Sequence, residues 1–175
     1  MHDRLLAASA FALVALSNTL SAGAAEEPTP TGDFRDWHVY SAGSGGERSC
    51  FAVTPPKEMT PPGANRNGVF FMITSWPARN VKNQPSVVPG YPYKDMSSAT
   101  VQIGSDKFEF FTKNDGNAGG AWMETTDDEA KLLAAMRKGS SMSVTGTSAR
   151  GTLTRDNYSL AGISAALDKI ATDCK

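Results

Sequence analysis

The stretch that decides the fold runs from Ser143 to Cys174, SVTGTSARGTLTRDNYSLAGISAALDKIATDC. Polar and apolar residues alternate in its first half, which predicts two β-strands over 142–147 and 151–155. Apolar side chains then recur at steps of three and four residues, at Leu160, Ile163, Leu167, Ile170 and Cys174. This spacing predicts an amphipathic helix capped by Ser159, with the final cysteine on the face that meets the core.

The chain contains two cysteines, Cys50 and Cys174. In an exported protein two cysteines are expected to form a disulfide bond. The bond would fasten the C-terminal helix to the strand that carries Cys50. Closing so long a loop contributes about 4–5 kcal/mol in the chain-entropy description. The alternative is a pair of buried free thiols.

The N-terminal sequence predicts export from the cytoplasm. Arg4 and an apolar run from Leu5 to Leu16 precede small residues that end at Ala25, and this order is typical of a secretory signal peptide over 1–25. The run is shorter than the roughly 20 residues that a membrane-spanning helix needs. We therefore expect a periplasmic or secreted protein of a Gram-negative envelope. A polar, Pro-rich lead-in over 26–33 is predicted to be disordered, and residues 34–175 are predicted to form a single domain.

The charge balance argues against nucleic acid as a partner. The chain carries 17 Lys and Arg against 18 Asp and Glu, for a net charge of −1. A nucleic-acid-binding domain usually has a basic stripe and a high pI. After the signal peptide no second apolar run is long enough to span a membrane, so no transmembrane segment is expected in the mature chain.

Short strands dominate the rest of the sequence. They are predicted over 34–41, 48–54, 69–76, 99–103, 107–112 and 121–123. The Pro-rich segment 55–67 is predicted to be a surface loop, because prolines remove backbone donors. A helix is predicted from the capping pair Thr126 and Glu129 to Gly139. The fold class is therefore α+β and β-rich, an antiparallel sandwich or barrel-like sheet of about seven or eight strands with two helices.

A long irregular connection is predicted over 77–95, and long loops in compact domains are often functional. Four of its residues are typical of partner-binding surfaces, namely Arg79, Lys82, Tyr91 and Tyr93. They form the candidate partner-binding loop. The alternative is a loop packed on the sheet, with the tyrosines as lids.

No catalytic set is predicted from the residues. His38 is the single histidine after the predicted signal peptide, so a serine or cysteine nucleophile would have to converge on it. Asp36, Glu109 and Glu124 lie on strands or near their ends, but their spacing does not pair them. One histidine and two disulfide-bonded cysteines do not provide enough ligands for a zinc site. We expect no cofactor, no metal and no enzymatic activity; the alternative is an envelope hydrolase that uses His38 or two strand carboxylates.

A resemblance extends over most of the chain from Asp36 to Cys174. The matching residues are Asp36-Trp37, Cys50, Gly90-Tyr91-Pro92, Ala121-Trp122, Ala135-Met136-Arg137-Lys138-Gly139, Ser148-Ala149-Arg150-Gly151-Thr152, Asp156, Tyr158-Ser159-Leu160, Gly162, Ala166-Leu167 and Cys174. In their order and spacing they resemble the invasion-associated locus B family of exported alphaproteobacterial proteins.

The resemblance implies a small envelope or secreted protein linked in some pathogens to host-cell entry, with no established catalytic residues. We expect an interaction protein with an unidentified protein or envelope component as partner, contributing to host-cell association or to envelope function. A structural or stress role without a discrete ligand is the other alternative.

Overall fold

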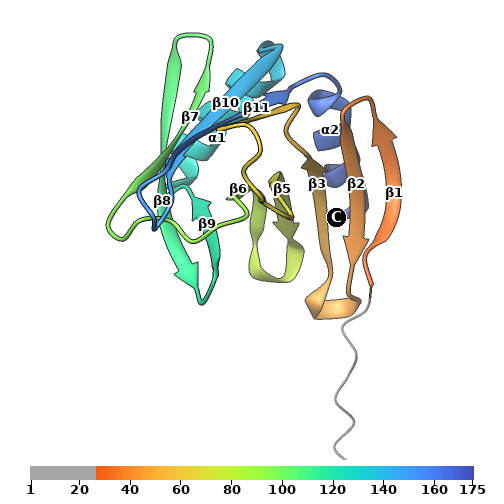
Figure 1. Cartoon of the computed structure of the whole chain (residues 1–175). Helices are drawn as coiled ribbons and strands as arrows, with labels where there is room; N and C mark the ends of the chain where they lie inside the picture. Colours follow the sequence, from red (N-terminus) through yellow and green to blue (C-terminus); the bar gives the residue numbers. More distant parts are fainter. Residues whose placement is uncertain (1–26) are drawn as a thin grey trace, which may run out of the picture.

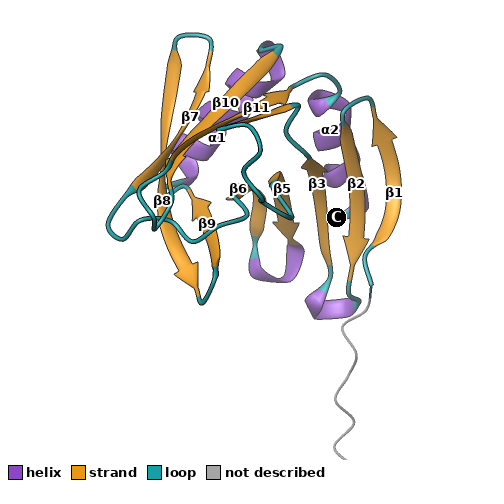
Figure 2. Cartoon of the chain, in the orientation of Figure 1, coloured by secondary structure: helices purple, strands orange, loops and turns teal. Residues whose placement is uncertain are grey.

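The structure is a computed structural model, and it describes residues 27–175 (Figure 1). The predicted signal peptide, 1–25, lies outside the described residues. Eleven strands are present, β1 (Thr29–Phe34), β2 (Trp37–Ala42), β3 (Ser49–Thr54), β4 (Glu58–Thr60), β5 (Phe70–Trp76), β6 (Val81–Val88), β7 (Ser98–Ile103), β8 (Asp106–Asp115), β9 (Ala118–Trp122), β10 (Ser141–Thr147) and β11 (Leu153–Ser159). The helices are α1 (Thr126–Lys138) and α2 (Ile163–Asp173), with single 3₁₀ turns η1 (Gly45–Glu47) and η2 (Pro77–Arg79) (Figure 2).

The strands form one continuous sheet in the order β1-β2-β3-β5-β6-β9-β8-β7-β10-β11-β4. Every strand pairing in the described chain is antiparallel. The prediction of a β-rich antiparallel fold with two helices is confirmed. The predicted number of strands was too low, and the strands form one open sheet where a sandwich or a barrel-like sheet was predicted.

The sheet is curled, so that the end of β11 comes back to the turn between β1 and β2. The indole Nε1 of Trp37 on β2 donates to the carbonyl oxygen of Ser159 at the end of β11, at 3.1 Å. The Asp36 amide donates to the Ala161 carbonyl oxygen at 3.3 Å. These bonds join segments more than a hundred residues apart, so the curl encloses a core between the two ends of the sheet.

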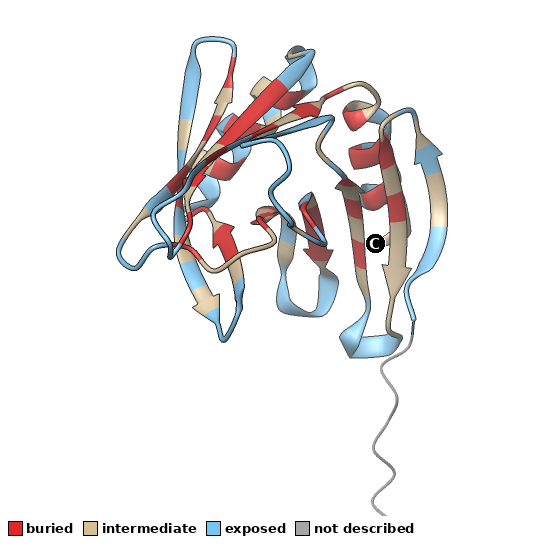
Figure 3. Cartoon of the chain, viewed as in Figure 1, coloured by how far each residue is buried: buried red, intermediate tan, exposed pale blue. Residues whose placement is uncertain are grey.

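Aromatic side chains fill this core. Phe71 on β5 packs edge-on against Trp37, Phe110 and Tyr158, with ring centroids 6.3, 6.2 and 6.0 Å away. All four rings are buried, and Figure 3 shows the buried residues concentrated on the strands and on one face of each helix. Such large aromatic groups supply much of the hydrophobic free energy that holds a small domain together.

The disulfide bond between Cys50 and Cys174 is present, as predicted. It links the end of α2 to β3, and α2 packs across β1, β2 and β3. The predicted apolar face of this helix is confirmed, since Ile163, Leu167 and Ile170 are buried. The helix begins later than predicted, however. Gly162 is its N-cap, and Ser159 ends β11, where its hydroxyl oxygen accepts from the Ala161 amide at 3.1 Å.

The first helix also differs by one residue at its start. Thr125 rather than Thr126 is the N-cap of α1, and its hydroxyl oxygen accepts from the Asp128 amide at 3.2 Å. The helix ends at Gly139 as predicted. Both helices lie behind the sheet in Figure 1 and touch each other, because Arg137 on α1 pairs with Asp168 on α2 at 2.9 Å.

Three segments predicted as irregular contain strands. Residues 29–33, predicted as a disordered lead-in, form β1, and the chain turns at Arg35 before β2, so the single strand predicted over 34–41 is also wrong. Part of the Pro-rich loop forms β4, paired to β11 at the edge of the sheet. Residues 81–88, within the predicted loop, form β6.

Strand β6 contains Pro85, which composition rules place outside central strands. Pro85 faces Ile73 of β5 and lies just beyond Ser86 and Val87, the two residues that pair with β9. The proline therefore occupies a position with a neighbouring strand on one side only, where it is tolerated.

No helix within residues 27–175 is both long enough and apolar enough to cross a membrane.

Candidate functional site

One recess in the described chain lies where several segments meet, and we call it the groove. These segments are the loop after β4, the loop after β6, the turn between β8 and β9 that carries Asn117, and the connection between β10 and β11. The groove is lined by Pro61, Ala64, Asn65, Arg66, Gly90, Tyr91, Pro92, Asn117, Ser148, Ala149, Arg150, Thr152 and Thr154. Its volume of about 640 Å³ is in the range of small-molecule sites.

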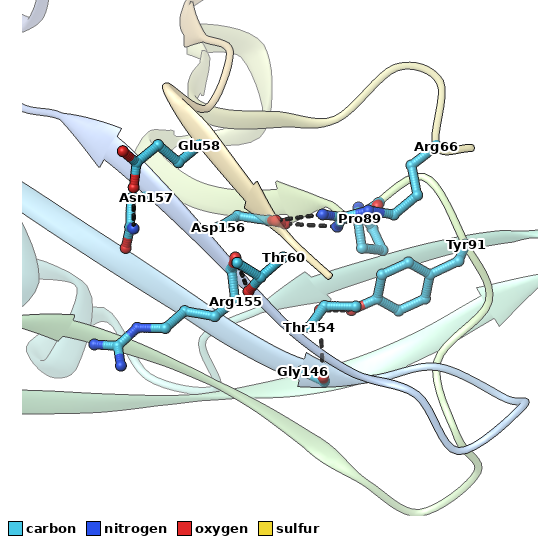
Figure 4. Close-up of polar contacts among 10 residues, drawn as sticks. All are labelled: Glu58, Thr60, Arg66, Pro89, Tyr91, Gly146, Thr154, Arg155, Asp156 and Asn157. Atoms are coloured by element: carbon cyan, nitrogen blue, oxygen red, sulfur yellow. Dashed lines mark hydrogen bonds and ion pairs between the residues drawn. The ribbon is translucent and has the colours of Figure 1, made fainter. Parts of the chain in front are cut away.

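A buried ion pair lies beneath the groove. The Nη1 and Nη2 atoms of Arg66 donate to the two carboxylate oxygens of Asp156 at 2.8 and 2.5 Å (Figure 4). Their side chains are only 5% and 3% exposed. The hydrogen bonds to Asp156 raise the pKa of Arg66 above its usual range. A bidentate, nearly buried pair of this kind fixes the 61–66 loop on β11.

Strand β11 carries Asp156 inward because Thr154, Asp156 and Tyr158 alternate along it, and all three are buried. Its neighbour β4 pairs Met59 with Asp156. The chain after β4 then brings Arg66 back over the strand.

Tyr91 forms one wall of the groove. The Arg66 guanidinium lies 5.7 Å from the centroid of its ring, close enough for cation–π attraction. The Thr154 hydroxyl donates to the Gly146 carbonyl oxygen at 3.2 Å and lies 2.6 Å from the Tyr91 hydroxyl (Figure 4). Because the single Thr154 proton is committed to Gly146, Tyr91 is the donor of this second bond. Burial raises the pKa of Tyr91, so the hydroxyl keeps its proton.

The opposite wall is the tight connection 148–152. The Ser148 amide donates to the Thr152 carbonyl oxygen at 2.9 Å, and the Thr152 amide donates to the Ser148 hydroxyl at 3.1 Å. The Ala149 amide donates to the Pro92 carbonyl oxygen at 2.8 Å, which ties this wall to the Tyr91 wall. Arg150 is exposed at the tip of the connection. The groove is therefore built on backbone bonds as well as side chains.

Tyr93 is not part of any exposed surface, contrary to its place in the candidate partner-binding loop. It is 1% exposed. The Asn114 side chain bonds both to its amide and to its carbonyl oxygen at 2.8 Å. Tyr91 lines the groove, whereas Tyr93 lies in the core, where burial raises the pKa of Tyr93.

Arg79 and Lys82 are separated from Tyr91 by strand β6. Arg79 pairs with Glu47 at 3.2 Å, and both side chains are largely exposed. Lys82 is exposed near the start of β6, whereas Tyr91 follows its end. Eight residues of extended strand span roughly 26 Å. The four candidate residues therefore do not form one surface, and a binding role for the segment stays a prediction that the groove can satisfy through Tyr91 alone.

The residues considered for catalysis are also dispersed. His38 on β2 contacts Asp33 on β1, with Nδ1 and Oδ1 2.6 Å apart, and both side chains are well exposed. Asp36 forms an ion pair with Lys57, and this hydrogen bond lowers the pKa of Asp36. Glu109 and Glu124 border one smaller cavity of about 440 Å³. Within residues 27–175, no group of three His, Cys, Asp or Glu side chains is placed to hold a metal ion.

The ion pair between Arg66 and Asp156 was not predicted from the sequence. Arg66 lies in a segment dismissed as a surface loop, and Asp156 is one of the residues of the family resemblance. A signal was available for Asp156, because the alternation that buries Thr154 and Tyr158 also places the carboxylate on the inner face. A buried charge requires a partner. The sequence offered no means to identify that partner.

The fold and the groove define a class of protein, a β-rich domain with one curled antiparallel sheet, a disulfide-fastened C-terminal helix and a recessed polar site. The chain belongs to the invasion associated locus B (IalB) protein family, whose model matches residues 41–171. The predicted resemblance is thus confirmed.

A solved structure with a similar fold is the crystal structure of invasion associated protein b from Bartonella henselae. The similarity covers 82% of this chain and 95% of that chain, with a TM-score of 0.58 and 15% sequence identity. At this identity the match demonstrates the shared fold alone. No curated protein matches the sequence.

Proposed function

We propose that this protein is an exported, periplasmic or secreted interaction protein that binds its partner in the groove and carries out no reaction. The observation that supports the proposal is the groove itself, a recess whose walls are tied together by backbone bonds and by the buried pair of Arg66 and Asp156. A site held in shape before binding loses less conformational entropy on association.

The disulfide bond between Cys50 and Cys174 supports export, because disulfides persist in oxidising compartments such as the periplasm. Membership of the IalB family supports an envelope or secreted role. Within this proposal, the partner is a protein or envelope component, and host-cell association is one setting in which such binding is useful.

Site-specific photo-crosslinking tests the proposal. A photoreactive residue at Thr152, which lines the groove, is compared with one at Thr172, an exposed threonine on α2. In the mature protein exported to its own envelope, we expect a discrete adduct from position 152 and none of that mass from position 172. Equal adducts from both positions, or none from position 152, would contradict binding in the groove.

The hydrolase alternative has one structural feature in its favour, since Glu109 and Glu124 border the same small cavity. Glycosidases use two carboxylates that flank the scissile bond. Lys107 and Asp128 also border this cavity, and no contact in the described chain links the two glutamates to His38. The groove therefore remains the better-supported site.

A further inference from the structure

The charged residues that line the groove are all basic. Two arginines line it, Arg66 and Arg150, and none of its lining residues is acidic. Asp156 neutralises Arg66 from below. Arg150 is exposed and forms no ion pair with any residue in the described part of the chain. The groove thus presents an unopposed positive charge at its rim, which favours a ligand that carries an anionic group.

Arg66 also retains donors that the protein does not use. Of its five N–H groups, one on Nη1 and one on Nη2 go to Asp156, and Nη1 has a long contact of 3.5 Å to the Pro89 carbonyl oxygen. Its Nε is buried and has no partner among residues 27–175. Arg66 lines the groove, and its charge, although paired with Asp156, adds to the basic character of this surface.

The remaining residues that line the groove can form hydrogen bonds with hydroxyl groups of a ligand. Neutral amides and hydroxyls surround the recess, on Asn65, Asn117, Ser148 and Thr152. The Tyr91 hydroxyl donates its own proton to Thr154, so its free lone pairs are available as acceptors. The Tyr91 ring and the faces of Pro61 and Pro92 offer flat apolar surface. Carbohydrates are complementary to such a surface. The hydroxyl groups at the edge of a sugar ring can bond to the polar groups, and the C–H groups on its faces can pack on the apolar surface.

We infer that the groove binds an acidic sugar, with the carboxylate at Arg150 and the hydroxyl groups toward the amides and Tyr91. This inference rests on the proposed function, because it names the ligand of the same groove. Its volume of about 640 Å³ accommodates one or two sugar rings. The sugar is either a free monosaccharide or one unit of an envelope or host polysaccharide, and both present the same chemistry.

Calorimetric titration of the mature protein with galacturonate and with its neutral counterpart galactose tests the inference. We expect galacturonate to bind at least about tenfold more tightly than galactose, since the carboxylate gains a charge-assisted bond. The substitution Arg150→Gln should weaken galacturonate binding about tenfold and leave the melting temperature unchanged, because the side chain is exposed. The matched control is Arg79→Gln, another exposed arginine, which should bind as the wild type does.

Trigalacturonate separates the two sources of ligand. Tighter binding of the trisaccharide than of the monosaccharide indicates a polysaccharide unit, and equal binding indicates a free sugar. Equal affinity for galacturonate and galactose, unchanged binding by Arg150→Gln, or no binding of galacturonate at millimolar concentration would each overturn the inference. If these titrations fail while position 152 still gives its discrete adduct, only the ligand class is wrong; if both fail, the proposed function fails as well.

Discussion

At the scale of single residues, the contact between Arg66 and Asp156 has the largest consequences for both stability and site. The two side chains are almost fully buried, and they join the loop after β4 to β11. Taking two charges out of water costs several kcal/mol for each ion, and their mutual attraction offsets this only when the geometry is good. Here both carboxylate oxygens are engaged. The pair therefore defines the shape of the groove more than it adds net stability.

Removing one partner should be far more harmful than removing both. We expect Arg66→Met to lower the free energy of unfolding by about 3–5 kcal/mol, because Asp156 is left buried and unpaired. Adding Asp156→Leu to this variant should restore much of the loss. Urea unfolding followed by circular dichroism measures both changes.

The exposed pair of Arg79 and Glu47 provides the control for this experiment. Arg79→Met should cost less than about 1 kcal/mol, as surface ion pairs contribute little. If Arg66→Met costs no more than Arg79→Met, the buried pair does not hold the loop in place.

At the scale of elements, the start of α2 depends on a single glycine. Gly162 has φ +97° and is the N-cap of the helix. A Cβ atom built at this position would overlap the backbone carbonyl of Phe34, at the end of β1. Backbone atoms cannot move aside as a flexible side chain can, so this close approach requires glycine.

The substitution Gly162→Ala should therefore be strongly destabilising. Strain at positive φ costs about 1–2 kcal/mol, and overpacking adds about 1–3 kcal/mol. Gly151→Ala is the matched comparison, because Gly151 has φ +83° but open space around it. The Gly151→Ala variant should lose only the stability that the strained positive φ costs. Thermal unfolding of both variants measures the difference, and equal losses would mean that the approach of Phe34 is not tight.

At the scale of the whole molecule, two long-range connections hold remote parts of the curled sheet and α2 together. The Trp37 indole bonds to Ser159 across 122 residues, and the disulfide joins Cys50 to Cys174 across 124 residues. Together they fix β2, β3, the end of β11 and α2 relative to one another. Since β11 contributes Thr154 to the groove, the shape of the groove depends on these connections.

Loss of the disulfide should be visible as a large loss of stability. Replacing both cysteines with alanine should lower the free energy of unfolding by about 4–5 kcal/mol in the chain-entropy description. Urea unfolding with and without a reductant measures this. The reductant should destabilise the wild type by a similar amount and leave the double variant unchanged. A wild type that is indifferent to the reductant would contradict a tethering role.

Much of the fold was predictable because it follows from local patterns. The face of α2 formed by Ile163, Leu167 and Ile170 is a matter of helical spacing, and it is buried as expected. The pairing of Cys50 with Cys174 required only that no other cysteine exists. The strands β1, β4 and β6 were missed because they contain or adjoin prolines, and their pairing depends on the neighbours that the sheet supplies.

The sequence by itself determined the β-rich class, the two helices, the disulfide and the family, since each depends on composition, periodicity or short motifs. Only the tertiary structure decided the single curled sheet and the site. Arg66 and Asp156 are 90 residues apart, and neither residue predicts the other. Tyr91 and Tyr93 look alike in the sequence, yet the fold places one in the groove and the other in the core. Such contacts are made by the curl of the sheet, which brings remote segments together and is set by the sum of all strand pairings.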